Sequence, residues 1–119
     1  MFFSKTWDEV PAGSTLHVKF TTSGPFVFGG EHVVDRGPTA PVLVGRLPSG
    51  LSEFEIRMNQ NENHIFKFDA GFAGQACTFE LTAKVTTGGS THQQAFSAKH
   101  TLKNSGDMLT VKLAAVGEA

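Results

Sequence analysis

The chain has 119 residues, of which 39% are hydrophobic and 18% charged, and its formal net charge is -1. This length suits a single globular domain, which we expect to span residues 1–119. The composition excludes a disordered chain, a collagen and a disulfide scaffold. Lys and Arg residues occur singly and never side by side, so we expect no binding to nucleic acid.

The cellular compartment is inferred from one cysteine and from the absence of apolar segments. Cys77 is the only cysteine, which excludes an intramolecular disulfide and favours a reducing compartment. The first residues contain no apolar run long enough for a signal-peptide core. No stretch approaches the ~18 apolar residues of a membrane-spanning helix. We therefore expect a cytoplasmic protein without integral membrane association, while export without a leader sequence stays open.

Alternation of apolar and polar residues predicts that the chain consists of strands. In residues 14–22, for example, Leu16, Val18 and Phe20 share one face, and polar residues occupy the other. No stretch shows the period of a helix. Further strands are expected over residues 25–28, 32–35, 41–47, 52–58, 64–69, 76–87, 93–103 and 107–115.

Turn residues between these segments indicate how the strands connect. Gly88-Gly89-Ser90 and Asn104-Ser105-Gly106 separate the last three strands and predict an antiparallel meander at the C-terminal end. Strands 52–58 and 64–69 are expected to pair across an Asn-rich loop. About eight or nine short strands predict an all-β fold, an antiparallel β-sandwich of jelly-roll or Greek-key type. A small β-barrel is the alternative.

The residues that commonly carry catalysis form no recognisable arrangement. Cys77 shares its parity with Phe79 and Leu81, which predicts a small buried side chain rather than a nucleophile. The chain contains no Gly-x-Ser-x-Gly motif. None of the five histidines has a second histidine at the close spacing of a metal motif. We therefore expect no enzyme, no metal and no cofactor, and His100 is expected to be a core histidine.

Polar side chains gather in the Asn-rich loop and next to the Gly88-Gly89 turn. Their amides, carboxylates and imidazoles can form hydrogen bonds with sugar hydroxyls or with a partner's backbone. Trp7 is the only aromatic ring outside the histidines that carries a hydrogen-bonding group. The predicted ligand-binding residues are Asn59, Asn61, Glu62, Asn63, His64, His92, Gln94 and Trp7. The competing interpretation of the loop is a polar turn without a ligand.

These observations favour a non-enzymatic binding module, specifically a small soluble lectin on a β-sandwich that uses polar loop residues to bind a glycan. The alternative is a self-assembling structural protein or toxin component whose sandwich mediates protein–protein association. In that interpretation, the exposed parts of Phe2-Phe3 and Phe26-Val27-Phe28 would be association surfaces. In both cases we expect a homo-oligomer whose partner is a glycan or a protein.

Overall fold

The computed structural model describes residues 1–35, 41–46, 53–58, 62–88, 90–91 and 95–117. Their strands are β1 (Phe2–Val10), β2 (Thr15–Thr22), β3 (Phe26–Asp35), β4 (Val42–Arg46), β5 (Glu53–Arg57), β6 (Asn63–Phe72), β7 (Cys77–Thr87), β8 (Ser90–Thr91), β9 (Phe96–Leu102) and β10 (Met108–Gly117). No described segment is a helix with the length and hydropathy needed to cross a membrane.

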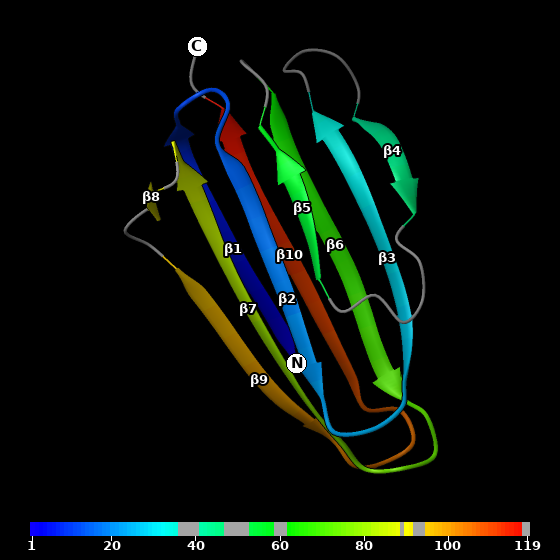
Figure 1. Cartoon of the computed structure of the whole chain (residues 1–119). Helices are drawn as coiled ribbons and strands as arrows, with labels where there is room; N and C mark the ends of the chain where they lie inside the picture. Colours follow the sequence, from blue (N-terminus) through cyan, green and yellow to red (C-terminus); the bar gives the residue numbers. More distant parts are fainter. Residues whose placement is uncertain (36–40, 47–52, 59–61, 89, 92–94, 118–119) are drawn as a thin grey trace.

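The described strands form two sheets of five strands that face each other (Figure 1). Sheet A has the order β1-β10-β6-β3-β4. Sheet B has the order β5-β2-β7-β8, and β9 pairs with β7 as well. The predicted all-β sandwich is therefore confirmed, and the described strands do not close into the alternative barrel.

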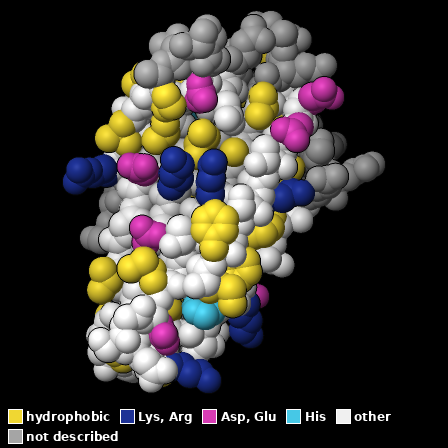
Figure 2. Space-filling model, turned by 180° about the vertical axis from the view of Figure 1, so that it is seen from behind, with side chains coloured by type: hydrophobic (Ala, Val, Ile, Leu, Met, Phe, Trp, Pro, Cys, Tyr) yellow, Lys and Arg dark blue, Asp and Glu magenta, His cyan; other side chains and the backbone are white. Residues whose placement is uncertain are grey.

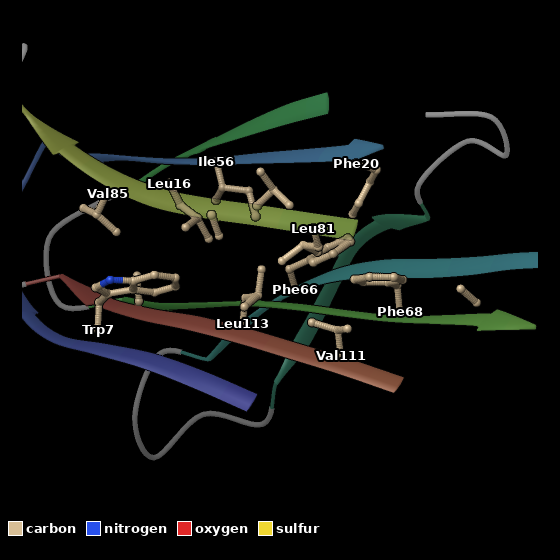
Figure 3. Packing of buried hydrophobic residues seen from close by; sticks show 14 of the residues in the cluster. Trp7, Leu16, Phe20, Ile56, Phe66, Phe68, Leu81, Val85, Val111 and Leu113 are labelled. Atoms are coloured by element: carbon tan, nitrogen blue, oxygen red, sulfur yellow. The ribbon is translucent and has the colours of Figure 1, made fainter. Parts of the chain in front are cut away.

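The core lies between the two sheets (Figure 3). Among the described residues, four of its buried side chains are phenylalanine, and so are all five partly buried side chains that pack against it. Alternate residues of a strand point to the same face, so β2 directs Leu16, Val18 and Phe20 inward, as predicted, and all three are buried. The ring centroid of Phe20 lies 5.1 Å from that of Phe68 on the opposite sheet and 5.7 Å from that of Phe79. Most of the phenylalanine content thus fills the space between the layers.

Strand β1 was not predicted, and it changes the topology. It runs parallel to β10, with Phe2 opposite Thr110 and Trp7 opposite Ala115, so the expectation of a purely antiparallel sandwich is wrong for this pair. The local pattern concealed the strand because Lys5 interrupts the apolar row on the face of Trp7. The Lys5 ammonium lies 5.8 Å from the centre of the Trp7 ring, and Trp7 itself is only 1% exposed.

Two predicted strand pairings are also wrong. Strand β5 pairs with β2 in sheet B, whereas β6 lies between β10 and β3 in sheet A; the segment between them therefore links the two sheets. At the C-terminal end, β7 and β9 form the predicted hairpin. Strand β10 then crosses to sheet A, so the meander does not continue. Local turn composition predicted where the chain reverses, but not which sheet receives the next strand.

The two side chains predicted to point inward from sheet B at this end behave differently. Cys77 is buried, as predicted, and its thiol donates a hydrogen bond to the Gly24 carbonyl at 3.3 Å. His100 of β9 lies opposite Phe79 of β7 and is half-buried. The inward parity of His100 is thus as expected, although its ring reaches the edge of the core rather than its centre.

Candidate functional site

The structure places part of the predicted Asn-rich site inside the sandwich. Asn63 and His64 are the first residues of β6 rather than loop residues, and His64 points inward and is 4% exposed. The neighbouring strand β3 contributes His32, whose ring stacks on that of His64 with a centroid distance of 5.4 Å. Glu62 completes a group that we call the His32–His64–Glu62 cluster.

Hydrogen bonds connect the three side chains of this cluster in a line. The Nε2 atom of His64 lies 3.3 Å from Oε2 of Glu62, so the N–H group of this nitrogen donates to the carboxylate. In neutral His64, the Nδ1 atom is then the acceptor. It lies 3.2 Å from Nε2 of His32, which donates to it. In this arrangement the Nε2–H group of His32 points toward Nδ1 of His64.

Burial and the mutual proximity of the rings disfavour a second positive charge in the cluster. Desolvation, followed by repulsion from His64, lowers the pKa of His32 below its ordinary value of 6.5. The neighbouring Asn63 has a buried side-chain oxygen, Oδ1, with no hydrogen-bond partner. Because His64 is enclosed, the cluster is suited to joining β3 to β6 rather than to contacting a large ligand.

Of the other predicted site residues, the structure describes only Trp7. Asn59, Asn61, His92 and Gln94 lie outside the described residues. Trp7 shares an inward row with His64, because Ala115 of β10 lies opposite both of them. The structure therefore brings Trp7 to the same end of the core as the cluster, and the buried ring offers no face for stacking a sugar.

A groove on the outer face of sheet B was not predicted from the sequence. Its volume is about 710 Å³, and its lining comes from four strands, β5, β2, β7 and β9, together with Ala95. Cross-strand register explains this composition: His17 lies opposite Glu55 and Lys84, and Lys19 lies opposite Glu53 and Thr82. The register thus brings polar side chains of neighbouring strands side by side along the groove.

The polar side chains of this groove are ordered by contacts with one another. His17 Nδ1 lies 2.9 Å from Oε1 of Glu55, and His17 Nε2 lies 2.8 Å from the Thr86 hydroxyl oxygen. The ring is therefore held by both of its neighbouring strands. Acidic side chains occupy β5, and the basic side chains Lys19 and Lys84 occupy β2 and β7.

The sequence predicted the polar faces that line this groove, but it did not predict which strands lie next to each other. Alternation assigned Glu53 and Glu55 to a solvated face, and it assigned His17 and Lys19 to the polar face of their own strand. Only the pairing of β5 with β2 places these two faces side by side. A search for polar residues that lie opposite one another on the outward faces of neighbouring strands would have included His17, Lys19, Glu53 and Glu55 among the candidates.

Metal binding and family relationships provide no further assignment. Among the residues that the structure describes, no group of three or more His, Cys, Asp or Glu side chains is arranged to hold a metal ion. No protein-family model, curated protein or solved structure matches this chain.

Proposed function

We propose that the chain is a non-enzymatic binding module, a lectin that holds a neutral oligosaccharide in the groove of sheet B. The observation that carries this proposal is the placement of carboxylates opposite nitrogen-bearing side chains across the groove, Glu53 opposite Lys19 and Glu55 opposite His17. Sugar hydroxyls both donate and accept hydrogen bonds. Carboxylates accept from them and ammonium groups donate to them, so this lining serves both roles.

The dimensions and charge of the groove support an extended, uncharged ligand. Four strands are separated by three spacings of about 4.8 Å, so the lining extends over roughly 14 Å, which exceeds a single sugar ring. Lys19 and Lys84 are balanced by Glu53 and Glu55, so a strongly charged ligand gains little. Because these residues lie on strands rather than on loops, the site is formed before a ligand binds.

A glycan array with neutral oligosaccharides, followed by calorimetry on the best ligand, tests this proposal. Glu55→Gln and Lys84→Ala each remove one charge from the groove, and we expect each to weaken binding about 10-fold, since a hydrogen bond to a charged group contributes ~1.5–3 kcal/mol. Glu80→Gln and Lys99→Ala are the matched controls, because these side chains are exposed on sheet B outside the groove. Unchanged affinity in both groove variants would reject the site.

One observation favours self-assembly as a second candidate function. Strand β4 is the last strand of sheet A, and its residues Val42, Leu43 and Val44 are exposed. An apolar edge strand offers unpaired backbone groups to another chain. Sedimentation velocity of the protein and of Val44→Lys tests this function: association that depends on concentration and disappears in the variant supports it, and a monomer at all concentrations rejects it.

A further inference from the structure

The outer face of sheet A carries a second groove, on the opposite side of the molecule from the groove of sheet B. Its volume is about 580 Å³. Figure 2, in which the molecule is turned by 180° from the view of Figure 1, shows this face. Lys, Arg, Asp and Glu side chains form a band across its middle, and hydrophobic side chains lie above and below the band. The side chains used in the argument below are Phe2, Glu31, Arg46, Lys67, Asp69 and Lys112.

The cations of this groove are not neutralised by close contacts. Lys112 of β10 lies directly opposite Lys67 of β6, and like charges in this position destabilise a sheet. Glu31 of β3 lies opposite Lys67 of β6 on one side and opposite Arg46 of β4 on the other. Within the described part of the chain, no carboxylate lies within ion-pair distance, 4.0 Å, of Lys67, Lys112 or Arg46. Three cationic groups therefore remain free to contact an anion.

An exposed aromatic ring forms the apolar wall of the same groove. Phe2 is 63% exposed, although strand β1 holds its backbone opposite Thr110 of β10. Strands β10 and β6 separate β1 from β3, where Gly29 lies opposite Asp69 of β6. A Cβ atom added at Gly29 would meet nothing within 4 Å. The surface at Gly29 is thus open, and Asp69 lies beside it in the register.

Asp69 is positioned to accept hydrogen bonds from a ligand. One of its oxygens, Oδ1, already accepts the Thr110 hydroxyl proton at 2.7 Å, which orients the carboxylate. Together with Glu31 it adds two negative charges to the three positive ones, and the lining keeps a net charge of one positive. The ligand unit that matches this lining has one anionic group, several hydroxyls and a flat apolar face.

We propose that this groove is a second binding site, specific for an acidic saccharide with one carboxylate per sugar ring. Lys67, Lys112 and Arg46 contact the carboxylate, Glu31 and Asp69 accept protons from hydroxyls, and Phe2 packs against the C–H face of the ring. The two carboxylates of the groove repel a ligand unit that carries several charges on adjacent groups, such as a nucleoside polyphosphate. The site is separate from the groove of sheet B and does not depend on its function.

Calorimetry with a galacturonic acid trimer, and with a galactose trimer as its neutral match, tests the proposal. We expect the acidic trimer to bind at least about 10-fold more tightly than the neutral one in this groove and to lose affinity as salt is added, because screening weakens exposed charge contacts. Lys67→Ala and Lys112→Ala should each weaken the acidic trimer about 10-fold. Phe2→Ala should weaken it without changing the salt dependence.

Controls separate this site from the first one and from other anions. Lys99→Ala removes an exposed lysine of sheet B and should leave the affinity for the acidic trimer unchanged. Glu55→Gln should affect only the neutral ligand, so either site can fail without the other. Equal affinity of the Glu55→Gln variant for the two trimers, or unchanged affinity for the acidic trimer in both lysine variants, overturns the proposal. Tighter binding of adenosine monophosphate at the same lysines also overturns it, in favour of a nucleotide site.

Discussion

Nε2 of His32 lies 3.2 Å from Nδ1 of His64, whose side chain is buried in the sandwich. The rings come from adjacent strands, β3 and β6, which pair over ten residue positions. A contact of this kind requires one nitrogen to donate and the other to accept. The join between the two strands is therefore sensitive to protonation.

The first prediction is a loss of stability at mildly acidic pH. The pKa of His32 is lowered in the folded protein, so the unfolded chain binds more protons below pH 6.5, and the free energy of unfolding falls as the pH falls. This contribution is complete above pH 6.5 and decreases as the pH drops through the folded-state pKa. The charged groups near the pair are Glu62, whose Oε2 lies 3.3 Å from Nε2 of His64, and Asp35, which lies opposite Asn63 on the other face.

Urea unfolding between pH 5 and pH 8 measures this effect. We expect His32→Gln to flatten the dependence on pH in this window, because the variant has no imidazole to protonate at that position. His17→Gln is the control, since His17 lies on the outer face of sheet B. An equally steep dependence in the His32 variant would assign the effect to other groups.

The second prediction concerns the aromatic core. Phe20 is 5% exposed, and its ring contacts phenylalanines of both sheets. Phe20→Ala should therefore lower the free energy of unfolding by about 3–5 kcal/mol, through lost burial and a new cavity. Phe20→Leu keeps much of the volume and should cost less. Guanidinium unfolding followed by fluorescence of the buried Trp7 provides the measurement, and a loss below about 1 kcal/mol in Phe20→Ala contradicts this packing.

The third prediction is that Cys77 reacts slowly with thiol reagents. Its side chain is 1% exposed, and its thiol donates to the Gly24 carbonyl. In native protein, modification by Ellman's reagent should be limited by opening of the fold, and it should become rapid in denaturant. Rapid labelling without denaturant would show that the thiol is accessible in the native state.

The fourth prediction concerns the turn between β9 and β10. Gly106 has a φ angle of 91°, a conformation that residues with a Cβ atom adopt only at a cost. Gly106→Ala should therefore destabilise the protein by about 1–2 kcal/mol. Gly45→Ala is a matched control in strand β4, since its φ is not positive and a Cβ atom there meets nothing within 4 Å. Equal stability of the two variants in chemical denaturation would contradict the strained turn.

Local patterns were sufficient to predict which way many side chains point. Leu16, Val18, Phe20 and Cys77 were assigned inward from alternation alone, and all are buried. The reason is that strand geometry couples neighbouring residues directly, without reference to the rest of the fold. Strand β1 was missed because Lys5 breaks its apolar row, and its pairing with β10 joins the two ends of the chain.

The predicted site was less accessible to this reasoning. Glu62, Asn63 and His64 were identified as polar candidates, but their partner His32 is 32 residues away from His64 along the chain. Whether a polar residue faces solvent or the core depends on where its strand begins and on what covers it. His64 was predicted both as the first residue of the strand 64–69 and as part of the Asn-rich loop, because it follows a run of turn-forming residues.

The sequence by itself therefore determined most of the strand content (though not β1), the inward position of phenylalanines such as Phe20 and Phe79, and the polar outer faces of β2 and β5, because these properties depend on residues a few positions apart. Only the tertiary structure decided that β5 and β6 belong to opposite sheets, that Trp7 is enclosed, and that Glu55 meets His17 while Lys67 meets Lys112. Each of these facts depends on strand pairing between distant segments. Alternation along one strand contains no information about its neighbour, so the grooves became visible only after the sheets were assembled.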